Sequence, residues 1–176
     1  VDVVEIDPSM TAIARRFFRL QDNDRLRIVH EDARTYLNTN GSGQYDAILV
    51  DAFGSLFAVP YQLTTVEAVR EMNRSLNNDG VVILNLGSAL QGPGSEFLRA
   101  ELATYMAVFP NVSLFKVNRE YDDHRLQNLI IVATRSPTTP SFASPDPEIS
   151  GLLANHYTGV ISQDLPILTD DLAPVE

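Results

Sequence analysis

The chain of 176 residues contains no cysteine and only three histidines. Without cysteine it has no disulfide, no thiol nucleophile and no thiolate metal site. His30, His124 and His156 are far apart in the sequence, so they do not form the clustered pattern of a zinc site. We therefore expect no metal, and a reducing cytoplasm is the expected location.

Positive charge is also scarce. Thirteen Lys and Arg residues against 23 Asp and Glu residues give a formal net charge of -10. This charge repels the phosphate backbone that dominates nucleic-acid affinity, so nucleic acid is not an expected partner. The same field attracts cationic small molecules, although many proteins are acidic simply to stay dispersed. No apolar run approaches the ~20 residues that span a bilayer, and no membrane contact is expected from this segment.

The first half of the chain alternates between strand and helix patterns. Val1 to Ile6 is β-branched and almost continuously apolar, which is typical of a strand buried on both faces of a parallel sheet. From Met10 to Phe18 the apolar residues recur at the spacing of one helical face, with Asp7 as the expected cap and Pro8 as the first helical residue. The remaining elements of this half are a strand at 26–29, a short helix at 32–37 and a strand at 47–50.

The second half adds helices and then ends in strands. Thr64 and Glu67 predict a capping box before an apolar helix, which Asp79 and Gly80 are expected to end. The remaining predicted elements are a strand at 81–86, a helix around 98–109, strands at 112–117 and 129–133, and a short helix at 149–155. The two strands after the long helix are too close in sequence for a crossover helix, so they should form an antiparallel hairpin with its tip at 118–125.

An α/β chain that closes with an antiparallel hairpin is typical of the class I methyltransferase fold, a Rossmann-like sheet. The first strand of that fold and its glycine-rich loop are missing, because Gly41 and Gly43 precede a strand and are better interpreted as turn residues. We expect residues 1–135 to form this partial Rossmann-type domain and 136–176 to be its proline-rich wrap and acidic tail. Without that strand, we expect a gap in the sheet between the strand that starts at Val1 and the strand that starts at Ala47. Either another chain fills this gap or the two strands pair directly.

Acidic residues stand at the carboxyl ends of the first three strands, where open α/β sheets bind ligands. Glu5 is placed to accept the two hydroxyls of a ribose, since a carboxylate inside an apolar strand is costly to bury without a partner. Asp7 competes for that role but is better explained as a helix cap. Asp32 either accepts the exocyclic amine of adenine or serves only as a helix cap. These residues make a nucleoside the expected ligand.

Asp51 ends the third apolar strand. It is the best candidate for an acid that handles a proton or a cation during a reaction. The alternative is a purely structural role, in which Asp51 caps the following loop with Gly54 or Ser55.

Several stretches of this sequence resemble one enzyme family. Three of them resemble the catalytic domain of the polyamine aminopropyltransferases, the spermidine synthases. They are Val-Glu-Ile-Asp-Pro at 4–8, Glu-Asp-Ala-Arg-x-Tyr-Leu at 31–37 and Tyr-Asp-Ala-Ile-Leu-Val-Asp at 45–51. The ending at 168–176 is similar to the tail of bacterial spermidine synthase-like proteins. Together these stretches follow the order of the family along most of the chain.

The resemblance implies a site for decarboxylated S-adenosylmethionine as co-substrate. It places Glu5 on the ribose, Asp32 and Ala33 beside the adenine, and Asp51 at the attacking amine of a small-molecule acceptor. The implied reaction is direct displacement at the carbon next to a sulfonium, which needs alignment and proton removal and no metal. The family commonly forms dimers, so a homodimer is expected.

The sequence departs from the family after the third strand. The family has Asp-Ser-Ser-Asp where this chain has Asp51, Ala52, Phe53 and Gly54, so the second carboxylate that holds the polyamine is absent. The hairpin tip also replaces a Tyr-Pro loop of the family, and its acids at 122–123 are either a cation site or an ordinary solvated tip. Two alternatives therefore remain: an S-adenosylmethionine-dependent methyltransferase, or a degenerate domain kept for assembly.

Overall fold

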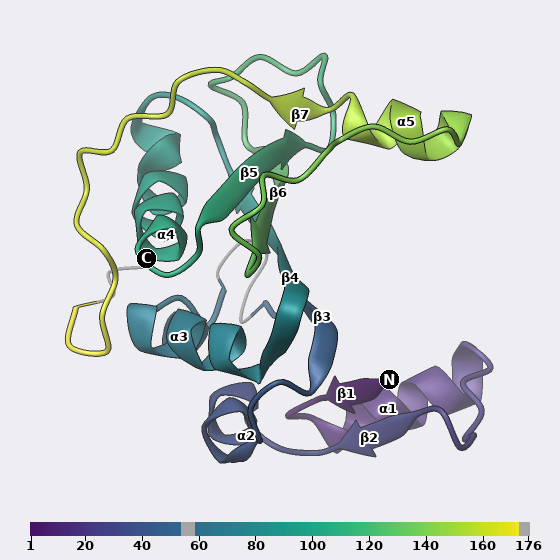
Figure 1. Ribbon diagram of the computed structural model, residues 1–176. Coiled ribbons are helices and arrows are strands. Elements are labelled where there is room, and N and C mark those ends of the chain that lie inside the picture. Colours follow the sequence, from purple (N-terminus) through teal and green to yellow (C-terminus); the bar gives the residue numbers. More distant parts are fainter. Residues whose placement is uncertain (54–58, 173–176) are drawn as a thin grey trace. The chain divides into compact units, whose positions relative to one another are not determined.

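The computed structural model describes residues 1–53 and 59–172. The chain divides into two compact units, Val1–Asn40 and Gly41–Glu176. The first contains a two-stranded sheet and the second a five-stranded sheet, with helices in both (Figure 1). Helices and strands alternate along most of the chain, so the expected mixed α/β class is confirmed.

The first unit is a β-α-β-α segment. Its elements are β1 (Asp2–Val4), α1 (Pro8–Phe17), β2 (Arg27–Val29) and α2 (Ala33–Thr39). The strands run parallel, with Val3 opposite Ile28. Both predicted caps are confirmed, because Asp7 accepts a hydrogen bond from the Ser9 amide at 2.8 Å and Asp32 caps α2. Local capping chemistry therefore sets where both helices begin.

The prediction that the first strand is buried on both faces is wrong. β1 has only three residues, and the side chain of Val3 in its centre is 40% exposed. Among the described residues β2 is the one strand that pairs with β1. A central parallel strand is buried because strands flank it and helices cover both its faces, and a two-stranded sheet lacks most of that cover.

The second unit is built around a mixed sheet. Its elements are β3 (Tyr45–Val50), a 3-10 turn (Tyr61–Leu63), α3 (Val66–Ser75), β4 (Leu76–Ser88), a second 3-10 turn (Pro93–Ser95), α4 (Glu96–Met106), β5 (Asn111–Lys116), β6 (Gln127–Thr134), α5 (Pro147–Leu153) and β7 (His156–Tyr157). The strand order is β3-β4-β6-β5-β7, with β3 parallel to β4. β5 and β6 pair antiparallel, so the predicted hairpin is confirmed. β7 was not predicted.

Two local predictions in this unit are wrong. The residue that caps α3 is Thr65, whose hydroxyl accepts a hydrogen bond from the Ala68 amide, and not Thr64. The helix ends at Ser75, so Asp79 and Gly80 lie inside β4 and do not end the helix. β4 starts early because Leu76 pairs with Tyr45 before a shift in the β3–β4 register.

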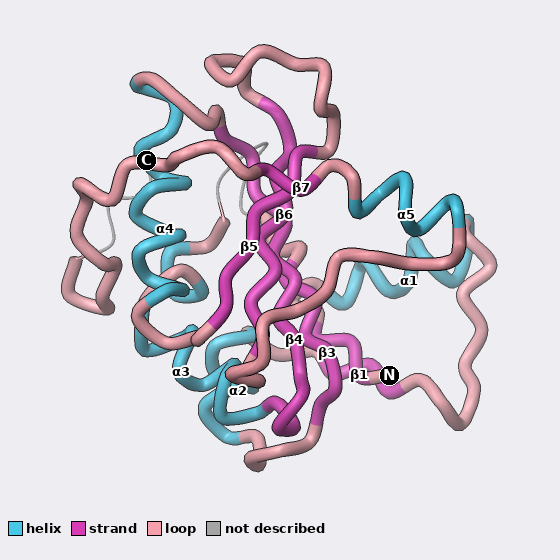
Figure 2. The backbone as a smooth tube through the Cα atoms, turned by 45° about the horizontal axis from the view of Figure 1, so that its top comes forward, coloured by secondary structure: helices cyan, strands magenta, loops and turns pink. Residues whose placement is uncertain are grey.

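Helices α3 and α4 lie on one side of the five-stranded sheet (Figure 2). The chain after β7 runs along these helices, where the Val66 amide donates to the Leu168 carbonyl and the Leu168 amide donates to Thr104 Oγ1. The side chain of Leu168 is only 2% exposed. This late segment therefore completes the apolar core around α3 and α4. Within the described ranges no helix has the length and apolar character needed to cross a membrane.

Candidate functional site

The first group of predicted site residues lies at the carboxyl edge of the β1–β2 sheet. Because the two strands are parallel, the residues that follow them emerge at the same edge. The Glu5 amide donates to the Val29 carbonyl at 3.0 Å, which extends the pairing by one residue. Glu5 Oε1 accepts a hydrogen bond from the Asp7 amide at 2.9 Å. The half-buried Glu5 carboxylate is thus held at this edge by the turn into α1.

Asp32 and Ala33 follow the second strand of the same sheet. Asp32 Oδ1 accepts a hydrogen bond from the Thr35 amide at 3.0 Å, and Ala33 is the first residue of α2. Both residues are half-buried. A carboxylate has two oxygens that each accept more than one hydrogen bond, so the cap is compatible with a further ligand. The structure brings Glu5, Asp32 and Ala33 to one edge of the first unit.

Asp51 follows β3 in the second unit and is exposed. Val50 pairs with Leu84, so the next residue of β4, Asn85, stands beside Asp51. Asn85 Nδ2 donates to Asp51 Oδ1 at 2.9 Å. The side-chain oxygen of Asn85 is buried and has no hydrogen-bond partner in the described part of the chain. The pair therefore places an exposed carboxylate beside a buried amide oxygen at the carboxyl end of two parallel strands.

Asn85 was missed by the sequence analysis. The available signal was a single amide inside the apolar strand Val82 to Leu86, close to its carboxyl end. Its contact with Asp51 depends on the β3–β4 register, which the sequence pattern does not give. Gly54 and Ser55, the alternative cap partners of Asp51, lie outside the described residues.

The hairpin acids have a structural role. Asp123 Oδ1 accepts from Lys116 Nζ at 3.0 Å, and its Oδ2 accepts from the Tyr157 hydroxyl at 3.2 Å. Asp122 Oδ1 accepts from the His124 amide at 2.8 Å. Burial raises the pKa of Tyr157, which keeps its hydroxyl protonated as a donor. Asp123 therefore ties the loop to β5 and β7, whereas Asp122 is exposed at the tip and caps a local turn.

Comparison with known proteins identifies the family. A model of the spermine/spermidine synthase domain matches residues 1–121. The chain belongs to this family. A polyamine aminopropyltransferase from Vibrio vulnificus is 38% identical over 122 residues, which are 68% of this chain and 39% of that protein. The chain thus spans about two fifths of the length of this curated relative.

Solved structures of similar proteins agree with the fold. A probable spermidine synthase from Corynebacterium glutamicum has a TM-score of 0.71 at 25% identity, covering 91% of this chain and 55% of its own. Human methyltransferase-like protein 13, solved in complex with SAH, has a TM-score of 0.63 at 25% identity, covering 87% of this chain and 68% of its own. The predicted class I methyltransferase-like fold is confirmed. Within the described residues, no group of three His, Cys, Asp or Glu side chains is arranged to hold a metal ion.

Proposed function

We propose that this member of the spermine/spermidine synthase family binds decarboxylated S-adenosylmethionine and transfers its aminopropyl group to a small amine. The observation that carries the proposal is the Asp51–Asn85 pair at the carboxyl end of β3 and β4. An attacking amine must lose a proton and must be aligned with the carbon it attacks. A carboxylate beside a fixed amide oxygen suits both tasks.

The residues of the first unit act on the nucleoside in this proposal. The Glu5 carboxylate accepts hydrogen bonds from the two ribose hydroxyls. In related dinucleotide-binding folds an acid that follows the second strand of the complete sheet has this role, and β1 corresponds to that strand. Asp32 and the backbone of Ala33 hold the adenine. The turn that fixes Glu5 through the Asp7 amide supports this role, because it orients the carboxylate before any ligand binds.

The reaction step is a single displacement. The neutral amine attacks the methylene carbon next to the sulfonium, a C–N bond forms as the C–S bond breaks, and the sulfur leaves as a neutral thioether. Asp51 takes the proton that the new ammonium loses, and Asn85 Oδ1 accepts a hydrogen bond from the second N–H of the amine. The net charge of -10 favours a cationic acceptor. Since Gly54 stands where the family has a second acid, we expect a weak grip on the acceptor.

Product analysis tests this proposal. The protein is incubated with decarboxylated S-adenosylmethionine and putrescine, and methylthioadenosine and spermidine are measured by mass spectrometry. Asp51→Asn should slow their formation by about 10²- to 10⁴-fold, the usual contribution of a general base. Asp46→Asn is the matched control, because Asp46 forms the same kind of pair with Asn77 at the opposite end of β3 and β4. Equal rates in the two variants would contradict the role of Asp51.

A methyltransferase is the second candidate, and the similarity to human methyltransferase-like protein 13 favours it. Such an enzyme would consume S-adenosylmethionine and release S-adenosylhomocysteine. The same assay with S-adenosylmethionine and a mixture of amines separates the two functions by the nucleoside product. Release of S-adenosylhomocysteine without methylthioadenosine would replace the aminopropyl proposal by the methyltransferase one.

A further inference from the structure

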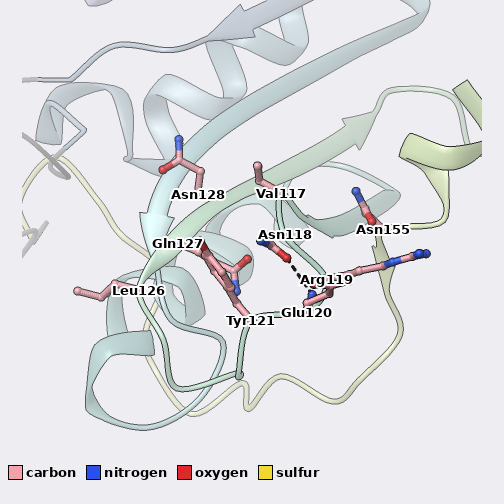
Figure 3. A pocket seen from close by; sticks show the side chains of 9 residues that line it. All are labelled: Val117, Asn118, Arg119, Glu120, Tyr121, Leu126, Gln127, Asn128 and Asn155. Atoms are coloured by element: carbon pink, nitrogen blue, oxygen red, sulfur yellow. Dashed lines mark hydrogen bonds between the residues drawn. The ribbon is translucent and has the colours of Figure 1, made fainter. Parts of the chain in front are cut away.

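A pocket of about 700 Å³ opens at the tip of the β5–β6 hairpin in the second unit (Figure 3). It is lined by side chains of the hairpin and of the turn between α5 and β7: Val117, Asn118, Arg119, Glu120, Tyr121, Leu126, Gln127, Asn128 and Asn155. Its volume is within the range of small-molecule sites. Glu5, Asp32, Ala33 and Asp51 are not among its lining residues.

Gln127 is the decisive residue of this pocket. It is only 6% exposed, yet neither its side-chain oxygen nor its nitrogen has a hydrogen-bond partner within residues 1–53 and 59–172. Its backbone is fixed at the start of β6, opposite Ser88 of β4. A buried amide without partners is unfavourable, and a ligand that satisfies both atoms recovers that free energy on binding.

The lining also indicates the chemistry of the ligand. Four carboxamide side chains, Asn118, Gln127, Asn128 and Asn155, line the pocket, and its two charged residues are of opposite sign. A neutral ligand is therefore favoured over an ion, because burying an unpaired charge there would be costly. The unpartnered amide of Gln127 offers one donor group next to one acceptor, and its complement is a ligand with an acceptor next to a donor.

Tyr121 provides a flat surface in the same lining. The guanidinium of Arg125 lies 3.9 Å from the centroid of its ring, and this stacking restricts the orientation of the ring. Leu126 and Val117 add apolar area. A small planar body that carries the amide edge fits these contacts better than a flexible polar chain, because offset stacking and apolar burial add to the hydrogen bonds.

We propose that this pocket binds a small, neutral, planar molecule with an amide edge, held by a two-point hydrogen bond to Gln127. The chemical class includes primary carboxamides and lactams on a ring. Nicotinamide and uracil are suitable probes because each has a carbonyl oxygen next to an N–H group. Nicotinate is the matched negative probe, since it has the same ring and lacks both the neutral amide and its N–H.

Titration followed by NMR tests the proposal. In a ¹H–¹⁵N spectrum the side-chain NH₂ signals of Gln127 are identified by their loss in Gln127→Leu. Nicotinamide or uracil should shift these signals together with the backbone amides of 117–121, and nicotinate should leave them in place. Gln127→Leu should weaken binding by about tenfold or more, as expected for the loss of two hydrogen bonds to a buried amide. Gln163→Leu is the control, because Gln163 is an exposed glutamine outside the pocket.

Two results would overturn the proposal. One is that neither neutral probe shifts the backbone amide signals of 117–121 at millimolar concentration, which needs no variant and so does not depend on the folding of Gln127→Leu. The other is that nicotinate shifts them as strongly as nicotinamide. Thermal unfolding gives a separate check: Gln127→Leu should be at least as stable as the unsubstituted protein, because leucine removes an unsatisfied buried amide. A marked loss of stability would mean that Gln127 has a structural role.

Discussion

Glu101 is the most unusual side chain at the residue scale. It lies in α4, is fully buried, and neither of its carboxyl oxygens has a hydrogen-bond partner in the described ranges. Burial raises the pKa of this carboxyl well above its ordinary range. Burial also raises the pKa of the Tyr105 hydroxyl, which faces the sulfur of Met72, and the electrostatic effect of Glu101 acts in the same direction. The protonated form of Glu101 is therefore the form that suits its surroundings.

The raised pKa of Glu101 predicts how the free energy of unfolding depends on pH. Because the pKa of Glu101 is higher in the folded than in the unfolded chain, the folded state binds more protons between the two values and stability falls as pH rises through that window. Glu101→Gln removes this loss, so it should raise the free energy of unfolding at neutral pH, with a gain that shrinks toward the ordinary carboxyl pKa. Urea unfolding at several pH values measures the gain. A gain that stays constant with pH, or a loss at neutral pH, would refute the assignment.

Predictability differed sharply between individual residues. Glu5, Asp32 and Asp51 could be placed at strand ends because apolar runs end at them. Asn85 and Gln127 could not, because their surroundings are created by strand register and by the hairpin tip, which pair residues far apart in the sequence. The roles of Glu5, Asp32, Ala33 and Asp51 remain predictions.

At the scale of elements, the segment after β7 matters more than its sequence suggests. Leu168 is buried, and the backbone around it bonds to α3 and α4. Asp170 adds a contact at the N-terminus of α3, where its Oδ1 accepts a hydrogen bond from the Thr65 hydroxyl at 2.6 Å. Arg99 in α4 also pairs with Asp164. We infer that this segment stabilises the helices that cover the five-stranded sheet.

Leu168→Ala should therefore lower the free energy of unfolding by about 2–5 kcal/mol, the usual range for a buried leucine. Leu172→Ala is the matched control, because the side chain of Leu172 in the same segment is 54% exposed. Urea unfolding monitored by circular dichroism gives both values. If the two variants lose the same small amount, the segment does not contribute to the core.

Element types were predicted better than their ends. The amphipathic spacing of α1 and the hairpin of β5 and β6 follow from periodicity and loop length, both of which are local. The boundary of α3 and β4 was wrong because pairing of Leu76 with Tyr45 overrides the turn signal of Asp79 and Gly80. β7 is a strand of two residues that pairs with β5, and two residues are too few for a local sequence pattern to mark a strand.

At the scale of the whole molecule, both sheets of the described residues are open, and each therefore has two edge strands. β1 is one such strand in the first unit and β3 is one in the second. β3 also presents Leu49, whose side chain is 75% exposed. Exposed strand edges favour pairing with another chain. On this ground we propose that the protein forms a homodimer.

The boundary between a partial Rossmann-type domain at 1–135 and its wrap and tail at 136–176 remains a prediction.

Light scattering after size exclusion tests the homodimer. The protein should elute with twice the chain mass of 19.5 kDa, and Leu49→Lys should shift it toward the monomer because a charge on an edge strand opposes pairing. Leu152→Lys in α5 is the control, since Leu152 is also exposed, at 64%. A monomer at all concentrations, or an equal shift in both variants, would contradict association through β3.

Calorimetric titration with the two sulfonium nucleosides tests the account most directly. We predict that decarboxylated S-adenosylmethionine binds at least about tenfold more tightly than S-adenosylmethionine, because the additional carboxylate is disfavoured by a chain of net charge -10. Glu5→Gln should weaken the binding of both. Tighter binding of S-adenosylmethionine would contradict the aminopropyl function, and binding of neither nucleoside would contradict the nucleoside site itself.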